Sequence, residues 1–222
     1  MKNFYTNRRL FIASCAATSI APFSYSANLA EKLTLTPKST EGPFYPDKLP
    51  LDTDNDLLII NNSITEAVGE VTHLSGKVLT QSGSPLANAL VEIWQVDAKG
   101  IYMHSKEPNV AKKDSNFQSY GRFLTNNKGE YYFRTIKPIE YGTRVFRTPH
   151  IHAKVSRKGK HLLTTQMYIK GEKLNRKDRI YNSIKDPKAK ENVTREFKAF
   201  QHAELKQYKV NFDIVVGFTP SE

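Results

Sequence analysis

Two histidines one residue apart are the first side chains whose spacing indicates chemistry. They lie in the stretch RVFRTPHIHAKV, Arg144 to Val155, which is patterned like a half-buried strand. Successive side chains of a strand point to opposite faces, so His150 and His152 should share one face. Neutral imidazole is the commonest metal ligand, and one strand would hold two of them side by side. A His-x-His pair is equally typical of a surface pair or a satisfied core pair, so other residues must decide.

Tyrosines at segment ends are the remaining candidates for completing a metal site. The single cysteine, Cys15, lies near the N-terminus, and the zinc motif H-E-x-x-H is missing. Tyr102 follows the strand-like segment that carries Trp94, and Tyr141 precedes the histidine segment. Phenolate is a hard anionic donor that suits ferric iron better than zinc or copper(I), and it forms at neutral pH only beside a strong Lewis acid. Either tyrosine taken alone is more typical of a sheet-edge aromatic residue.

The elements that must position these side chains are expected to be strands. Segments of alternating apolar and polar residues, separated by turn residues, read THLSGKVLT, LVEIWQVD, GRFLTNNKGEYYFRTI, HIHAKV, HLLTTQMYI and YKVNFDIVVG. We expect the first two to form a hairpin across a Gly-containing loop, and the third to fold back about its Asn/Gly turn. This pattern predicts an all-β fold, an antiparallel sandwich with a single core.

Three regions differ in composition from one another. Residues 1–27 read as an export signal, residues 28–70 as an extended arm and linker rich in turn formers, and residues 71–222 as the β-sandwich domain. Within that domain we expect a long charged insertion, Gly171 to Lys206, with one short helix near Thr194 to Leu205.

The leader has a basic start, a modest apolar stretch and small residues before Ala27. The apolar stretch is too short for a membrane span, which needs about 20 apolar residues, so we expect no stable membrane insertion. Arg8 and Arg9, followed by Leu-Phe-Ile, resemble a twin-arginine signal and predict export of the folded protein to the periplasm. An ordinary secretory signal is the alternative, and IASC around Cys15 loosely resembles a lipoprotein box.

The composition favours a folded domain with a basic surface. The 222-residue chain is 39% hydrophobic, with 12 Phe and 11 Tyr, which is ample for a core. Its formal net charge of +11 suits an anionic partner. However, Lys and Arg are scattered, and no aromatic-interleaved basic helix or RNA-binding signature is present. We therefore expect no nucleic-acid partner.

Five ordered motifs resemble the intradiol ring-cleavage dioxygenases, specifically the protocatechuate 3,4-dioxygenase branch. They read TEGPFYPD, SGKVLTQSGSPLANALVEIWQVDAKGIY, GRFLTNNKGEYYFRTIKPIEY, RTPHIHAKV and TTQMYIKGE. The resemblance implies a β-sandwich with one ferric, non-haem iron per chain. The implied iron ligands are Tyr102, Tyr141, His150 and His152. By the same resemblance, Arg147 is the active-site arginine and Gln166 its polar neighbour.

The implied reaction inserts dioxygen between the two hydroxyl-bearing carbons of a catechol and opens the ring to a cis,cis-muconate. Tyr141 would leave the iron as substrate binds and carry off a proton, and Arg147 would stabilise negative charge on the ring. The segment from Tyr141 to His150 is shorter than in the family, and Thr143 stands where an aromatic residue is often found, so we expect a reshaped pocket. The short arm before the strands favours a protocatechuate-like substrate, and the presence of all motifs in one chain predicts a homo-oligomer.

Two hypotheses of other classes remain open. One is an exported, metal-free β-sandwich binding module, in which changing Tyr102 or Tyr141 to Phe alters only local packing. The other is a different iron or copper oxidase built on the same sandwich. Metal analysis combined with a visible spectrum separates all three, because tyrosinate bound to ferric iron absorbs visible light.

Overall fold

The computed structural model describes residues 32–50, 52–61, 63–142 and 146–217. The predicted export signal, including Arg8, Arg9 and Cys15, lies outside the described residues, as does Thr143. The strands are β1 (Val71–Thr80), β2 (Ala89–Trp94), β3 (Tyr120–Leu124), β4 (Glu130–Ile136), β5 (His150–Arg157), β6 (Lys160–Ile169), β7 (Thr194–Arg195), β8 (Lys198–His202), β9 (Leu205–Asn211) and β10 (Ile214–Val216). The short helices are η1 (Val110–Lys112), η2 (Lys173–Arg176), α1 (Arg179–Ser183) and α2 (Pro187–Val193).

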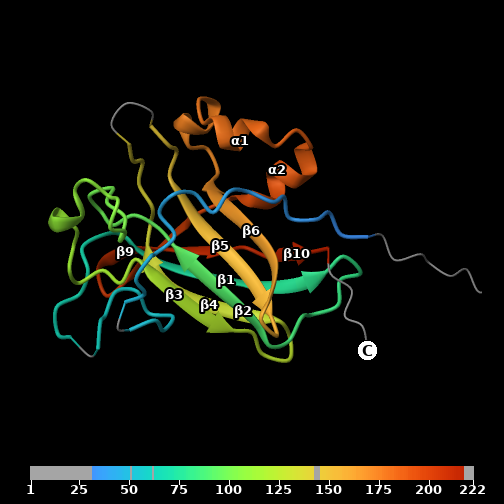
Figure 1. The fold of residues 1–222 in the computed structure, drawn as a ribbon, viewed down its shortest axis with the longest axis horizontal. Helices are drawn as coiled ribbons and strands as arrows, with labels where there is room; N and C mark the ends of the chain where they lie inside the picture. Colours follow the sequence, from blue (N-terminus) through green and yellow to red (C-terminus); the bar gives the residue numbers. More distant parts are fainter. Residues whose placement is uncertain (1–31, 51, 62, 143–145, 218–222) are drawn as a thin grey trace, which may run out of the picture. The chain divides into compact units, whose positions relative to one another are not determined.

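The strands form two five-stranded sheets that enclose one main core (Figure 1). One sheet has the order β10-β1-β9-β8 with β4 also paired to β1, and the other has the order β3-β2-β5-β6-β7. Inward-facing residues of both sheets meet in this core, among them Leu74 and Phe133 from one sheet and Val91 and Ile151 from the other. The predicted all-β sandwich is confirmed, and its pairs are antiparallel except for β1 with β9 and β10 and β6 with β7.

The two hairpins expected from the sequence are wrong. β1 and β2 lie in different sheets, and so do β3 and β4, so each loop carries the chain across the core instead of back along a neighbour. Alternation shows that one face of a strand is buried, but it does not show which strand lies alongside. Gly129 lies in the loop from β3 to β4. Its φ of +71° favours glycine, and a Cβ there would lie 2.6 Å from the Val78 carbonyl oxygen.

The charged insertion is also organised differently from the expectation. The helix expected near Thr194 to Leu205 is absent from the described structure, where β7 and β8 occupy that stretch, and the α-helices α1 and α2 precede it. Ala203 and Glu204, with φ of +46° and +67°, form the two-residue turn between β8 and β9. Residues with a helix propensity therefore form strands here, because β9 pairs with β1 in the sheet and β8 pairs in turn with β9.

The N-terminal arm contains no strand in its described residues before Val71, yet it is packed rather than loose. Leu57 and Leu58 are 0% and 1% exposed within the core, so the segment predicted as an extended arm and linker is packed against the sandwich. The Leu57 amide donates to the Arg134 carbonyl oxygen at 2.8 Å, and Phe44 stacks on Tyr102 with ring centroids 5.1 Å apart. The arm thus contributes to both the core and the region of the predicted site.

Strand β5 lies at the centre of its sheet, between β2 and β6. Its first four residues are all buried, which is the pattern of a strand covered on both faces. The register places His152 opposite Trp94 on β2 and opposite Gln166 on β6, so a row of side chains crosses three strands on one face. Among the described residues no helix is long and apolar enough to cross a membrane.

Candidate active site

The two histidines of β5 lie on the same face, as their spacing predicts. Both are buried, at 2% exposure each, and their Nε2 atoms face each other at 3.2 Å. His150 Nδ1 is 2.6 Å from the Thr148 carbonyl oxygen, so this nitrogen carries the proton and donates it. Nε2 of His150 is consequently left with its lone pair free to accept a proton or a cation.

The two predicted tyrosines lie beside the histidines and complete a closed circuit of four rings. Neighbouring ring centroids are 4.8 Å apart for His150 and His152, 5.6 Å for His150 and Tyr141, 4.9 Å for Tyr141 and Tyr102, and 6.1 Å for Tyr102 and His152. The tyrosines come from the loops after β2 and before β5, about 40 residues apart in the sequence. Tyr102 is fully buried, whereas Tyr141 is partly exposed.

Burial keeps all four rings uncharged in the absence of a cation. Burial, reinforced by the charge of Arg147, lowers the pKa of His150 to about 4. Burial and the neighbouring His150 lower the pKa of His152 well below its usual value. Burial also raises the pKa of Tyr102 well above its usual value and raises the pKa of Tyr141, where Arg147 opposes the effect. The cluster therefore presents neutral nitrogen donors and protonated phenols.

The donor atoms of this cluster fit a hard, highly charged metal ion. The described residues contain no group of three or more His, Cys, Asp or Glu side chains able to bind a metal, so a metal at the histidines needs the tyrosines as ligands. Tyr102 Oη, which belongs to this circuit of rings, is buried without a hydrogen-bond partner among the described residues, an arrangement that costs free energy unless another group satisfies it. Two imidazoles and two phenolates suit ferric iron.

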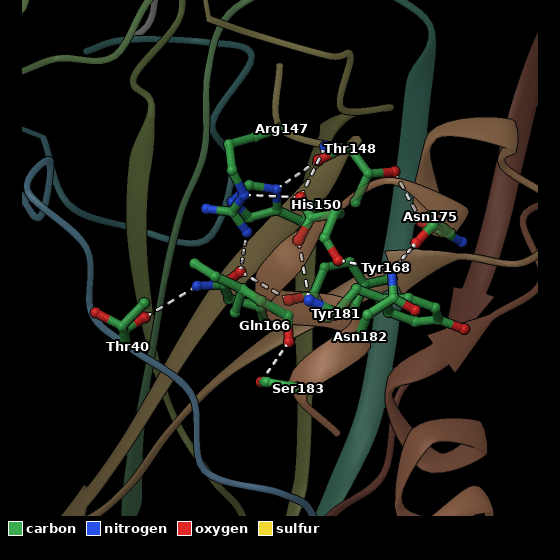
Figure 2. Close-up of polar contacts among 12 residues, drawn as sticks. Thr40, Arg147, Thr148, His150, Gln166, Tyr168, Asn175, Tyr181, Asn182 and Ser183 are labelled. Atoms are coloured by element: carbon green, nitrogen blue, oxygen red, sulfur yellow. Dashed lines mark hydrogen bonds and ion pairs between the residues drawn. The ribbon is translucent and has the colours of Figure 1, made fainter. Parts of the chain in front are cut away.

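Arg147 and Gln166, the other predicted site residues, lie beside the four rings and contact each other. Arg147 Nη2 donates to Gln166 Oε1 at 2.8 Å, and Gln166 Nε2 donates to the Thr40 carbonyl oxygen at 3.0 Å (Figure 2). Tyr168 Oη also donates to Gln166 Oε1, at 2.9 Å. The structure thus brings all six predicted residues together and connects them to the N-terminal arm.

An aromatic wall behind His152 was missed by sequence reasoning. Trp94 stacks on His152 with centroids 4.6 Å apart and an interplanar angle of 11°. Tyr45 packs edge-on against Trp94, and the Tyr45 and Tyr120 hydroxyls both donate to the buried carboxylate of Glu92, at 2.8 and 2.6 Å. The only signal in the sequence was the position of Trp94 at the end of a strand-like segment, and its place opposite His152 on the neighbouring strand β5 comes from the register of the sheet.

Asp178 is the second residue that sequence reasoning missed. Its carboxylate accepts a hydrogen bond from Arg147 Nε at 2.7 Å, although it lies in the charged insertion, 31 positions along the chain. The only signal in the sequence was local: an Asp preceding a short helix is a typical N-cap residue. That pattern does not reveal which distant side chain the carboxylate also binds.

A cavity of about 980 Å³ lies apart from the four rings, against α2 and strands β7 to β9. Its lining is rich in cations and aromatic residues: Tyr132, Lys170, Tyr181, Lys190, Arg195, Lys198, Phe200 and Lys209. None of the six predicted site residues lines it. The cavity and the candidate metal ligands thus lie in different places. We assign the candidate active site to the buried ring cluster, because the donor atoms lie there.

Comparisons with known proteins give matches over most of the chain. Residues 40–217 match a family model described as Dioxygenase. The chain is 34% identical over 174 residues to the protocatechuate 3,4-dioxygenase beta chain of Burkholderia cepacia, covering 75% of this chain and 72% of the relative. It is 32% identical over 154 residues to catechol 1,2-dioxygenase 1 of Acinetobacter lwoffii, covering 63% of this chain and 48% of the relative. The chain therefore spans about half the length of that enzyme.

A solved structure of similar fold is the dioxygenase domain of a dioxygenase and carbohydrate-binding protein fusion from Streptomyces sp. SirexAA-E. The TM-score is 0.59 at 27% sequence identity, with 82% of this chain and 97% of that chain covered. The match extends over nearly the whole of that domain, so the two chains share the sandwich fold.

Proposed function

Because the chain belongs to the intradiol ring-cleavage dioxygenase family, we propose that it opens a protocatechuate-type catechol at one ferric iron. The proposed ligands are Tyr102, Tyr141, His150 and His152. The observation that carries this proposal is the closed circuit of four neutral rings, in which the Tyr102 hydroxyl is buried without a partner among the described residues. When bound, ferric iron would supply Lewis acidity that makes the catechol ring reactive towards dioxygen.

Tyr141 is proposed to accept a proton from the catechol. Of the two tyrosines it is the more exposed, and it lies in a loop whose backbone pairs with Arg147, whereas Tyr102 is enclosed by Phe44. A substrate hydroxyl can therefore reach Tyr141 without disturbing the core. A phenolate is a strong enough base to take this proton, since its conjugate acid has a pKa of about 10 in water.

Arg147 is proposed to stabilise negative charge on the substrate. Its guanidinium is permanently cationic, and it lies against the ring cluster with one edge held by Gln166 and one by Asp178. A charge that is already fixed in a largely buried site needs no reorganisation as negative charge develops. Removing one such group typically costs about 100-fold to 1,000-fold in rate.

A carboxylated catechol is the proposed substrate class. The support is the 34% identity to a protocatechuate 3,4-dioxygenase chain and a net charge that attracts anions: it is +11 for the full chain, and 11 − 3 = +8 without Lys2, Arg8 and Arg9 of the leader. The test is oxygen uptake with 3,4-dihydroxybenzoate under ¹⁸O₂. Ring cleavage between the hydroxyl-bearing carbons forms two new carboxylates and places one labelled atom in each of them, within a single ring-opened tricarboxylate product. A quinone and labelled water would instead identify an oxidase.

Export through the twin-arginine route to the periplasm is part of the proposal. It rests on Arg8 and Arg9 and on the advantage of loading a metal before export. Changing both to Lys keeps the charge and should leave the precursor in the cytoplasm, while unimpaired export would indicate the general secretory route.

A homo-oligomer is also proposed, and light scattering on the purified protein tests it.

A further inference from the structure

Asp178 connects the charged insertion to the candidate active site. Its side chain is 0% exposed and its carboxylate uses both oxygens. Oδ2 accepts from Arg147 Nε at 2.7 Å and from the Thr148 amide at 3.0 Å. Oδ1 accepts from the Tyr181 amide at 2.9 Å and so caps α1. One buried carboxylate therefore joins the start of a helix to the residues that lead into β5.

The first consequence concerns the orientation of Arg147. Gln166 on β6 holds Nη2 at 2.8 Å (Figure 2). Asp178 holds Nε at 2.7 Å, so the planar guanidinium is fixed at two of its three nitrogens. Because the group is rigid, two fixed nitrogens also fix the third. Neither of these two bonds uses Nη1, which is therefore the nitrogen that can meet a negatively charged ligand.

The second consequence concerns His150. The Thr148 peptide is held on its amide side by Asp178, and the Thr148 hydroxyl donates to Asn175 Oδ1 at 2.7 Å. The carbonyl oxygen of Thr148 accepts the proton of His150 Nδ1 at 2.6 Å (Figure 2). That hydrogen bond selects the His150 tautomer in which Nε2 is unprotonated. Asp178 therefore influences the tautomer of His150 indirectly, by holding the backbone of Thr148.

We propose that Asp178 is a positioning residue that aligns Arg147 and His150 together. The inference rests on the proposed function, because it assigns these two residues their roles at the iron site. Asp178 itself contacts neither ring nor substrate: it acts through the guanidinium and through the Thr148 peptide. The charged insertion, Gly171 to Lys206, thus contributes a residue that orients active-site side chains.

Asp178→Asn isolates this role from helix capping. Asn is as good an N-cap as Asp, so its Oδ1 still accepts from the Tyr181 amide. The other atom becomes an NH₂ group that faces two donors, Arg147 Nε and the Thr148 amide. The matched control is Asp186→Asn, since Asp186 caps α2 in the same way, through the amides of Lys188 and Ala189 at 2.9 and 3.4 Å, without contact to the site.

The experiment measures iron retained against a competing chelator and kcat/KM from oxygen uptake. For Asp178→Asn we expect a loss of about 10-fold to 100-fold in iron affinity and at least about 10-fold in kcat/KM, the usual range for groups that orient metal ligands. Asp186→Asn should stay within about twofold of wild type in both. Asp178→Asn at wild-type levels would overturn the proposal.

A double variant separates positioning from general structural damage. Because Asp178 acts partly through Arg147, adding Asp178→Asn to Arg147→Met should lower kcat/KM by clearly less than Asp178→Asn does in the wild-type background, with only the part transmitted through His150 remaining. An equal loss in both backgrounds would show that Asp178 does not act through Arg147 and would overturn the proposal.

Nitrogen-15 NMR of the metal-free protein tests the inference independently of catalysis. Wild type and Asp186→Asn should keep the proton of His150 on Nδ1, and Asp178→Asn should show a mixture of tautomers. An unchanged tautomer in Asp178→Asn contradicts the effect on His150. If the wild-type protein fails to bind iron while Asp178→Asn still shows the mixture of tautomers, the proposed function is refuted and the positioning role stands.

Discussion

At the scale of single residues, Tyr102 and Tyr120 differ in the hydrogen-bond partners of their buried hydroxyls, and this difference separates a site residue from a structural one. Both tyrosines are 1% exposed. The Tyr120 hydroxyl donates to the Glu92 carboxylate at 2.6 Å, whereas the Tyr102 hydroxyl has no partner among the described residues. A buried group kept unpaired costs stability, so its presence points to a role that folding alone does not explain.

Replacing these tyrosines with Phe should therefore have opposite effects on the metal-free protein. Tyr120→Phe should lower the free energy of unfolding by about 1.5–3 kcal/mol, the contribution of a hydrogen bond to a charged group. Tyr102→Phe should leave it unchanged or raise it by about 1 kcal/mol, while iron retention falls. Chemical denaturation of both variants checks this, and a loss of stability in Tyr102→Phe would show that its hydroxyl has a structural partner.

The Asp178 carboxylate gives a prediction about pH. Burial raises the pKa of Asp178, but hydrogen bonds from the Tyr181 amide and the Arg147 guanidinium outweigh this, so the net shift is below the usual value of 3.8. A carboxylate with a depressed folded-state pKa contributes stability that is complete above pH 3.8 and is lost as pH falls through the folded-state pKa. Asp178→Asn removes that contribution at every pH.

The difference in unfolding free energy between wild type and Asp178→Asn should consequently be large at pH 6 and should shrink below pH 4. Breaking a buried ion pair costs about 3–5 kcal/mol, and the partial exposure of Arg147 places the expected difference at the lower end, about 3 kcal/mol. Urea denaturation across this pH range measures it. A difference that grows on acidification would mean that Asp178 is protonated in the native protein at neutral pH.

At the scale of elements, the close approach of β1 to the segment after β9 depends on a glycine. A Cβ at Gly76 would lie 2.0 Å from the Phe212 carbonyl oxygen, and Tyr131 Oη donates to that same oxygen. Gly217 is a matched contrast, because a Cβ there would meet only Leu35 at an ordinary distance of 3.6 Å.

Gly76→Ala should lower the free energy of unfolding by about 3 kcal/mol, since backbone must move to admit the methyl group. Gly217→Ala should change it by less than about 0.5 kcal/mol. Thermal or chemical denaturation of both variants checks this pair of values. Equal stabilities would show that the contact of β1 with residue 212 is looser in solution.

The strands, the two histidines on one face and the two flanking tyrosines could be predicted because their signals are local. Alternation fixes which side chains share a face, and loops at strand ends gather at one edge. Strand pairing could not be predicted, since an alternating segment fits either sheet equally well. Asp178 and Trp94 escaped for the same reason: their roles arise from partners that only the register and the fold bring near.

At the scale of the whole molecule, net charge should influence the choice of substrate. We expect 3,4-dihydroxybenzoate to be cleaved with a kcat/KM at least about 10-fold higher than catechol, equivalent to about 1.4 kcal/mol if one charge-assisted contact holds the carboxylate. Added salt should narrow the gap, because it screens attraction beyond a Debye length of about 8 to 10 Å. Equal rates, or a preference for catechol, would contradict the assignment to the protocatechuate branch while leaving the ring-cleavage chemistry intact.

The central claim is that Tyr102, Tyr141, His150 and His152 hold a ferric ion. The most direct measurement is the iron content of the purified protein together with its visible spectrum. We predict about one iron per chain and a red to brown colour from tyrosinate bound to ferric iron, with the colour altered in Tyr141→Phe and iron strongly depleted when either histidine is replaced by Ala. A wild-type protein that stays colourless after reconstitution with ferrous and ferric iron would contradict the account.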